Sequence, residues 1–515
     1  MGKQILIRNA KIYDGTGGRP FYGDVRIADG KISQVGRFLD GTDCEIVDGT
    51  GKILTPGFIN CHSHSELQPF QDPKMEQVIG QGITTEIIGQ DGLSVAPITD
   101  EYAAELTETM ICLCGKGERD FWWRSHAEYL KFVEETNPSC RFVGLLGSGS
   151  IRMSVMGSEN RPATPEELQK MCALIEKEMS EGARGISFGL IYPPSSYAST
   201  EEMIELCKSV AKYDGIMMVH VRNEMDRLVE SFEEMVRVMK ESGVRVEISH
   251  LKSLGPKNWG TVKTILERME QLQAEGYDIG FDQYPWNASS TGLRVVAPDW
   301  SYSGGTDAFE ARLRDPEMYQ KIYDGAAKIL EERGGGKCVQ VCAVPESTED
   351  YSWMPGLRMD EIAARMGLDE VAAVLEILAK TRSSVLCVYY NISDEDVQMV
   401  MRSPYQVVCT DGIVGTVPHP RAYASYPRFL GHYVRDLGVM PLETAVNHIT
   451  GEPARRLRLW DRGLIREGLL ADLVLIDYEH VINNNSYADP FAPSTGICKV
   501  WVGGELRYES DPGGT

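Results

Sequence analysis

The sequence predicts an α/β fold: a (β/α)8 TIM-type barrel with a small β-sandwich domain built from both chain termini and an insertion at the barrel mouth. Three observations predict this arrangement. Helix-like and strand-like segments alternate through the middle of the chain, both ends consist of short strand-like segments, and one internal stretch interrupts the alternation. A chain of 515 residues is too long for one ordinary core. A barrel of about 250 residues with insertions and a companion domain accounts for it.

The two ends of the chain have the same β-rich pattern. Residues 1–54 contain QILIRNAKIYDG and FYGDVRIADGKISQVG, in which apolar runs are separated by turn dipeptides such as DG. Residues 456–515 contain similar segments, GLLADLVLIDYEHVIN and GICKVWVGGELRYES. Two β-rich ends around a long middle predict one small domain to which both contribute.

Residues 55–455 alternate helices with strands and are predicted to form the catalytic barrel. A helix predicted over 166–183 follows a Thr164 N-cap and leads to the strand RGISFGLIY. Three more helix–strand units lead to IMMVHVRNE, VRVEISHLKS and YDIGFDQYPW. Such repeats predict a parallel sheet with right-handed crossovers. Residues 298–355 break the rhythm with Gly- and Asp-rich turns, so we interpret them as an insertion, or lid, over the barrel mouth.

Charge and composition argue against several classes of protein. The chain has 52 basic and 75 acidic residues, a net charge of −23, which argues against nucleic-acid and anionic-membrane partners. It has no apolar run of about 18 residues and begins without the apolar region of a signal peptide. The 12 scattered cysteines are typical of reduced thiols in a cytoplasmic protein. Cys112 and Cys114 have no second pair, which argues against a structural zinc site there.

The segment GFINCHSHSE, residues 57–66, places two of the nine histidines at the end of an apolar strand. Because side chains alternate along a strand, His62 and His64 face the same way, roughly 7 Å apart at their Cα atoms. Two imidazoles so placed can share a metal ion, although an isolated HxH pair is more often a solvated loop.

Other polar side chains come at the ends of predicted strands, where a barrel forms its active face. These residues are Asp91, His220, His250, Asp282 and Asp411. Each alone is more often structural, but imidazoles and carboxylates together suit Zn²⁺ and similar divalent ions. The combination therefore predicts a metal site that activates water.

The pattern resembles the metal-dependent amidohydrolase superfamily and, within it, the N-acyl-D-amino-acid deacylases (D-aminoacylases). The similarity runs over nearly the whole chain and is weakest in the predicted insertion. It is carried by LTPGFINCHSH, GSGSIRMSVMG, EGARGISFGLIYPP, HVRNEMDRL, ISHLKSLGPKNWG, FDQYPWNASST, HPRAYASYPRFLGHYVRDLG and GLIREGLLADLVLID. The resemblance implies a barrel with a small β domain and hydrolysis of N-acyl-D-amino acids to a carboxylate and a free D-amino acid.

The resemblance also implies roles for the strand-end residues. His62, His64 and Asp411 would bind one divalent metal ion, and His220 and His250 a second. Zinc is the favoured metal, with one or two ions per chain. Asp411 would also act as the general base that takes a proton from metal-activated water.

The shared ligand departs from the family pattern. The family usually has cysteine in a GNCG-like turn, whereas this chain has GQDG, so Asp91 is expected to bridge the two metal positions. A carboxylate is harder than a thiolate and relaxes the preference for zinc. Glu86 is a weaker candidate because it lies earlier in its strand, and Cys61 faces away from the histidines.

The resemblance further implies a grip on the α-carboxylate of the substrate by Lys252, Tyr284, Ser290 and Arg421. A guanidinium can bind a carboxylate through two parallel hydrogen bonds, and the ammonium and hydroxyls add charge-assisted ones. Tyr192, in GLIYPP, would polarise the scissile carbonyl. Barrel packing is the alternative role for both tyrosines, and a surface salt bridge for Arg421.

Two other functions stay open at this point. One is a cyclic-amide hydrolase of the hydantoinase or dihydroorotase type, which shares the barrel and the HxH strand. The other is a non-catalytic relative that binds a metal or a ligand and has lost catalysis through the altered bridging residue. The expected partner is a small N-acyl amino acid. A homo-oligomer is an open expectation. The amino-acid side chain and the acyl group of the accepted substrate also stay open.

Overall fold

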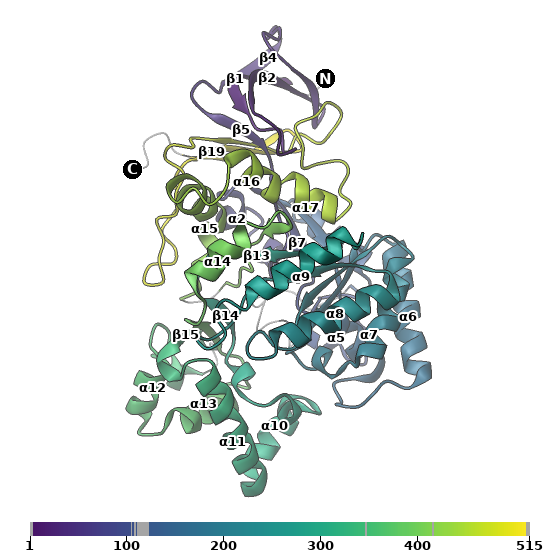
Figure 1. Cartoon of the computed structure of the whole chain (residues 1–515), viewed down its shortest axis with the longest axis vertical. Coiled ribbons are helices and arrows are strands. Elements are labelled where there is room, and N and C mark those ends of the chain that lie inside the picture. The colour runs from purple at the N-terminus through teal and green to yellow at the C-terminus, as the bar shows by residue number, and fades with distance from the viewer. Residues whose placement is uncertain are drawn as a thin grey trace.

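The computed structural model describes residues 4–104, 106–107, 110, 123–345, 348–414 and 417–510. Cys112 and Cys114, which we predicted not to form a zinc site, lie outside the described residues. Figure 1 shows three parts along the long axis: a small β domain near the N-terminus, a barrel with its helices, and a helical lobe at the opposite end.

The predicted (β/α)8 barrel is confirmed. Parallel ladders run through one sheet of three strands and one of six, in which β8 and β9 are two halves of one strand on either side of Leu145. The backbone N–H of Asp411 donates to the His62 carbonyl at 2.9 Å, and Ser63 pairs in parallel with Gly412, which joins the last strand to the first. The barrel strands are β6 (Phe58–Asn60), β7 (Ile83–Ile88), β8 (Arg141–Gly144), β9 (Leu146–Gly147), β10 (Gly185–Gly189), β11 (Ile216–His220), β12 (Arg245–Ile248), β13 (Ile279–Gln283) and β17 (Gln406–Val408).

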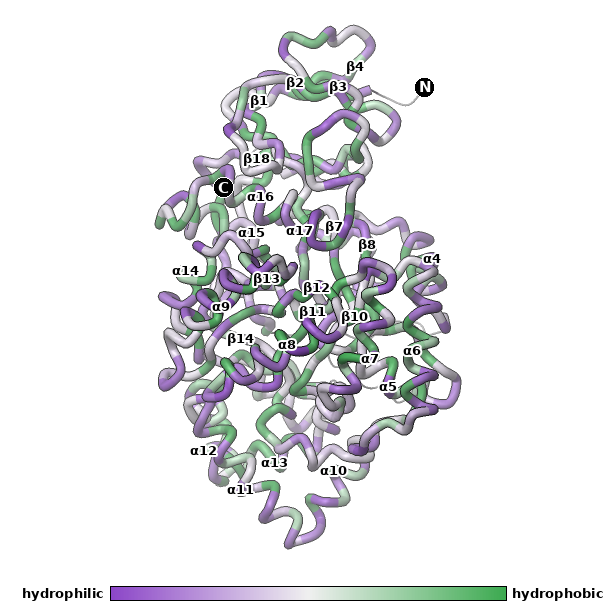
Figure 2. Tube along the Cα trace, turned by 45° about the vertical axis from the view of Figure 1, so that its right-hand side comes forward, coloured by the Kyte–Doolittle hydropathy of each residue, from purple (hydrophilic) through white to green (hydrophobic). Residues whose placement is uncertain are grey.

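Amphipathic helices cover the outside of the barrel. Helix α6 begins with the expected cap, since the Thr164 hydroxyl accepts from the Glu167 N–H, and it ends at Ser180, just before Gly182 takes a left-handed φ of 119°. Figure 2 shows hydrophobic residues gathered along strands β10 to β12, against which these helices pack. The outer helices are α4 (His126–Glu135), α5 (Ser148–Met156), α6 (Pro165–Ser180), α7 (Thr200–Ala211), α8 (Leu228–Ser242), α9 (Val262–Ala274), α14 (Asp394–Met401) and α16 (Leu442–Ile449).

The β domain is built from both termini, as predicted. Strand β5 pairs antiparallel with β18, with Leu54 opposite Leu475, and both side chains enter a core that also contains Trp501. The predicted domain limits, 1–54 and 456–515, stay a prediction. The strands are β1 (Gln4–Ile12), β2 (Phe21–Ala28), β3 (Lys31–Gly36), β4 (Cys44–Asp48), β5 (Ile53–Pro56), β18 (Leu473–Ile476), β19 (Ile497–Val502) and β20 (Glu505–Glu509).

The helical lobe in Figure 1 contains the predicted insertion. Its hydrophobic core extends from Leu293 to Tyr389, beyond the predicted range of 298–355, because β15 pairs with β16 and closes the unit. Strand β14 also pairs with β16 and connects the lobe to the barrel mouth. The elements are β14 (Ser289–Gly292), α10 (Gly305–Arg314), α11 (Pro316–Glu332), β15 (Val339–Ala343), α12 (Met359–Met366), α13 (Glu370–Lys380) and β16 (Leu386–Tyr389).

The described part of the chain also contains the short helices α1 (Gln68–Gln71), α2 (Glu76–Ile79), α15 (Arg421–Arg428) and α17 (Gly451–Arg456), and a π-helix over Phe429–Asp436. Within the described ranges, no helix combines the length and the apolar character needed to cross a bilayer. The cysteines described there are free thiols.

Candidate metal centre

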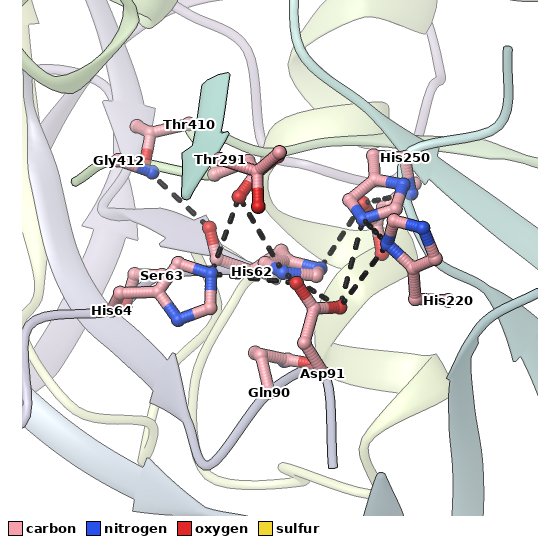
Figure 3. A network of polar contacts seen from close by, with 12 residues as sticks. His62, Ser63, His64, Gln90, Asp91, His220, His250, Thr291, Thr410 and Gly412 are labelled. Carbon is pink, nitrogen blue, oxygen red and sulfur yellow. Dashed lines mark hydrogen bonds and ion pairs between the residues drawn. The ribbon is translucent and has the colours of Figure 1, made fainter. Parts of the chain in front are cut away.

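The predicted metal ligands meet at the carboxyl ends of the barrel strands. His62 and His64 follow β6, Asp91 follows β7, His220 ends β11, His250 follows β12 and Asp411 follows β17. All six side chains are buried. Figure 3 shows four imidazoles and Asp91 pointing toward one another from these separate segments. Segments up to 349 positions apart therefore form one compact polar group, because parallel strands bring their carboxyl ends to the same face.

One set of possible metal donors consists of His62, His64, Asp91 and Asp411, which offer atoms within 4.8 Å of one another. The Nε2 atom of His64 lies 3.6 Å from Asp91 Oδ2 and 3.3 Å from Asp411 Oδ1. The Nε2 atom of His62 lies 3.6 Å from Asp91 Oδ1. Two imidazoles and two carboxylates facing a common point suit a divalent cation.

A second set consists of Asp91, His220 and His250. Asp91 Oδ1 lies 3.8 Å from His220 Nδ1 and 3.6 Å from His250 Nε2, and those two nitrogens are 2.9 Å apart. Because Asp91 belongs to both sets, its carboxylate lies where a ligand shared by two ions would have to lie.

The hydrogen-bonding state of these atoms fits a metal. Neither ring nitrogen of His62 makes a hydrogen bond, and Asp91 Oδ1 makes none either, although both residues are buried. Buried polar atoms are normally paired, so a set of unpaired ones that face each other indicates a ligand. Neutral nitrogen and anionic oxygen are the donors that Zn²⁺ and its neighbours accept.

The electrostatics of the site favour positive charge at its centre. Burial alone would lower the pKa of His64, but contact with Asp411 and Asp91 raises this pKa to about 9. Burial would raise the pKa of Asp91, but the charge of His62 and a bond with His250 hold it well below its usual range. Burial lowers the pKa of His220 to about 4, which keeps this imidazole in the neutral form that binds metals.

Three of the six residues have left-handed backbone conformations, with φ of 55° at Asp91, 36° at His250 and 46° at Asp411. Non-glycine residues adopt such angles at a cost, and aspartate tolerates them better than histidine. Each lies in the turn just after its strand, where the conformation aims the side chain into the centre. Strain concentrated at one functional face is common in binding and catalytic sites.

Glu224 is a member of the site that the sequence analysis missed. Its Oε2 lies 3.4 Å from His220 Nε2, and its Oε1 lies 3.3 Å from His250 Nδ1 and 2.5 Å from Lys252 Nζ. The carboxylate thus lies close to the outward-facing nitrogens of both imidazoles, a placement from which it can orient histidine ligands. The signal was present in HVRNE, which puts an acid four positions after His220.

Asp282 and Glu86 have supporting positions outside both donor sets. Asp282 Oδ1 accepts from the backbone N–H of His250 at 2.8 Å and lies 3.7 Å from His62 Nδ1. Glu86 accepts from Asn60 Nδ2 at 3.0 Å and Ser65 Oγ at 2.9 Å. Neither Glu86 nor Cys61, which lies in an apolar cluster, is among the grouped donors.

A narrow cavity opens onto the metal donors, and most of the predicted substrate residues line it. Tyr192 shares a 2.8 Å hydrogen bond with the Thr291 hydroxyl. The Tyr284 hydroxyl is buried without a hydrogen bond. The Ser290 hydroxyl donates to the Cys387 carbonyl at 3.0 Å, and Lys252 is paired with Glu224.

Arg421 differs from expectation in its position. It lies outside the cavity lining, with its guanidinium carbon 4.5 Å from the Tyr284 ring centre. Its Nη1 is 2.7 Å from Asp411 Oδ2, and its Nη2 donates to the Ser290 carbonyl at 3.0 Å. The guanidinium therefore contacts the expected general base, and its grip on a substrate carboxylate stays a prediction.

Comparisons with known proteins show which family the chain belongs to. A model of the amidohydrolase family matches residues 45–331 and 356–508. The chain is 30% identical to an N-acyl-D-aspartate deacylase of Alcaligenes xylosoxydans xylosoxydans, over 98% of this chain and 92% of that protein. It is also 30% identical to a D-aminoacylase of the same organism, over 97% and 93% of the two chains.

Among solved structures, an N-acyl-D-glutamate deacylase from Bordetella bronchiseptica, complexed with zinc and a phosphonate inhibitor, superposes with a TM-score of 0.84. The identity is 27%, and the match covers 99% of this chain and 98% of that one. The chain therefore belongs to the amidohydrolase family and, within it, to the group that contains D-aminoacylase.

Proposed function

We propose that the chain is a metal-dependent amidohydrolase that cleaves the amide bond of N-acyl-D-amino acids. Water adds across the amide, the acyl group leaves as a carboxylate, and the D-amino acid leaves with a free amino group. The observation that carries the proposal is the convergence of four imidazoles and two carboxylates, of which all but His62 line one cavity. The similarity to two deacylases over nearly the whole chain supports it.

Asp411 is the proposed general base. Burial would raise its pKa, but the charges of Arg421 and His62 hold the pKa far below its usual range, so it is ionised at neutral pH. It lines the cavity beside His64, where it can take a proton from the attacking water and pass it to the departing amine. The two donor sets would hold a divalent cation, and this cation would supply the Lewis acidity that polarises a carbonyl and lowers the pKa of water.

Tyr192 is the proposed carbonyl donor. Burial and the nearby charge of Asp91 raise the pKa of its phenol well above the usual value, so it keeps its proton. Its hydroxyl is held by Thr291 at 2.8 Å, at the wall of the cavity. A neutral, fixed O–H can donate to the oxygen that gains charge as water adds to the amide.

Zinc is the first candidate for the metal, with one or two ions per chain. Two imidazoles in each donor set favour zinc, and a related deacylase was solved with zinc bound. Asp91 in place of a thiolate widens the choice to harder ions such as Mn²⁺.

Tyr284, Ser290, Lys252 and Arg421 are proposed to bind the substrate α-carboxylate. Tyr284 has a free hydroxyl in the cavity wall, and Lys252 and Ser290 line the same cavity. Arg421 contributes positive charge from behind Tyr284. A cytoplasmic location and a homo-oligomer complete the proposal.

The test is acetate release by the zinc-loaded chain from paired N-acetyl-D- and N-acetyl-L-amino acids, with a hydantoin and dihydroorotate as cyclic substrates. We expect turnover of D substrates that a chelator abolishes and added zinc restores. Arg421→Ala should lower kcat/KM on the D substrates. Turnover of the cyclic amides alone would identify a cyclic-amide hydrolase, and no turnover at all would identify a binding protein.

A further inference from the structure

The helical lobe contributes a cation to the cavity. Arg333 follows directly after α11 and serves as its C-cap residue. Its side chain is 94% buried, since only 6% of the residue is exposed, and it lines the same cavity as Tyr192, His250 and Ser290. It therefore approaches the metal donors from the part of the chain that is not barrel.

Arg333 has no acidic partner. Among the described residues, no carboxylate oxygen lies within 4.0 Å of its guanidinium, and its Nε is buried without a hydrogen bond. Its guanidinium carbon lies 5.1 Å from the Tyr389 ring centre, a contact that positions the group without neutralising it. A buried cation without a counter-ion is costly, and such a cost is commonly met where a ligand supplies the anion.

The other two cations near the cavity are already neutralised. Lys252 Nζ lies 2.5 Å from Glu224, and Arg421 Nη1 lies 2.7 Å from Asp411. Arg333 is thus the cavity's unpaired cation within the described part of the chain. It lies near Ser289 as well, because Tyr389 pairs with Ser289 in the lobe's sheet.

We propose that Arg333 binds a second carboxylate of the substrate, so that the preferred substrates are N-acyl derivatives of D-aspartate or D-glutamate. The inference rests on the proposed function and specifies its substrate. A guanidinium offers two parallel N–H donors to a carboxylate, a geometry that an amide or an alkyl side chain cannot match. Of the residues assigned to the α-carboxylate, Lys252 and Tyr284 follow barrel strands and Ser290 lies in β14 at the barrel mouth, which leaves Arg333 for the side chain.

The test compares kcat/KM of the zinc-loaded chain for N-acetyl-D-glutamate, N-acetyl-D-glutamine and N-acetyl-D-leucine. We expect a preference for glutamate over glutamine that falls by about 10²- to 10³-fold in Arg333→Met, because a buried charge pair is lost. Arg333→Lys should restore part of that ratio. Arg294→Met is the matched control, since Arg294 packs on the Tyr302 ring in the same lobe, outside the cavity lining, and should leave the ratio unchanged.

Two results would overturn the inference while leaving the proposed function intact. One is a wild-type preference for N-acetyl-D-leucine. The other is an equal loss on all three substrates in Arg333→Met, which would assign Arg333 to the α-carboxylate or to lobe structure. If the wild type cleaves none of them, the proposed function fails, and calorimetry then tests the role of Arg333 separately. Tighter binding of N-acetyl-D-glutamate than of N-acetyl-D-glutamine, with the difference lost in Arg333→Met, supports the inference. Equal binding of the two compounds rejects it.

Discussion

The barrel buries charged side chains at both of its ends, and the two groups differ in how their charges are matched. At the amino ends of β12 and β13, which we call the floor, Arg456 donates to Glu247 at 2.7 Å and also pairs with Asp278. Arg245 pairs with Asp214 at 3.2 Å in the same region. At the opposite end, the rim, the donors are His62, His64, Asp91, His220, His250 and Asp411, and neither ring nitrogen of His62 makes a hydrogen bond.

This difference indicates that the floor residues serve stability and the rim residues serve function. Floor cations find their anions within the protein, so removing one leaves a buried group without its partner and destabilises the fold. Several rim atoms lack hydrogen-bond partners and three rim residues occupy strained turns, which the fold tolerates because a ligand completes the site. Substitutions at the rim should therefore lower activity more than stability, and substitutions at the floor the reverse.

The largest effect should follow Asp411→Asn at the rim. Loss of the general base should lower kcat/KM on N-acetyl-D-amino acids by about 10³- to 10⁴-fold. The denaturation midpoint of the chelated chain should change less than in the floor variant below. Steady-state kinetics and urea unfolding measure both. A variant that keeps wild-type kcat/KM would remove Asp411 from the mechanism.

At the floor, Arg456→Met should destabilise the chain by about 3–5 kcal/mol, because Glu247 and Asp278 lose a buried partner. The activity per folded molecule should stay near that of the wild type. Urea unfolding of the chelated chain gives the free energy, and active-site titration gives the folded fraction. A stable but inactive variant would show that the floor takes part in catalysis.

A smaller effect is expected for Glu224→Gln. Glu224 resembles the floor residues because it pairs with a cation inside the protein, but it supports the metal donors of the rim. Losing its charge should weaken zinc binding or activity by about 10- to 100-fold, since it orients His220 and His250. Competition with a chromophoric zinc chelator measures the affinity. Unchanged affinity together with unchanged kcat/KM would leave Glu224 a packing residue.

The smallest effect concerns pH. Burial raises the pKa of Glu247 to about 8, above the value of about 4.5 for an unfolded chain. The folded chain therefore holds this proton more tightly, and the stability it contributes is lost as pH rises from about 4.5 through 8. In the chelated chain, Glu247→Gln should flatten the fall in unfolding free energy between pH 5 and 8. An identical slope in both chains would place the ionisation elsewhere.

The rim could be predicted from the sequence because strand order and strand ends decide it. His220 ends its strand and His250 follows its strand by two residues, so alternation of helices and strands was enough to bring them together. The position at the end of a strand also identified Asp91, whose residue type departs from the family pattern. Glu224 was missed because it lies in a loop four residues beyond β11.

The lobe could not be predicted in the same way. Its boundary depends on β15 pairing with β16 across more than 40 residues, which local pattern does not reveal. The place of Arg333 depends on how that lobe folds against the barrel mouth. Arg421 shows a further limit, because the sequence indicated a carboxylate partner for it but not that Asp411 would supply one.

We expect the rim donors to bind a divalent cation through Asp91. Elemental analysis after zinc loading and dialysis tests this directly, with wild type and Asp91→Ala measured side by side. We predict one or two zinc ions per wild-type chain and fewer in the variant. A wild-type chain that retains no metal, or a variant that retains as much as the wild type, would contradict the account.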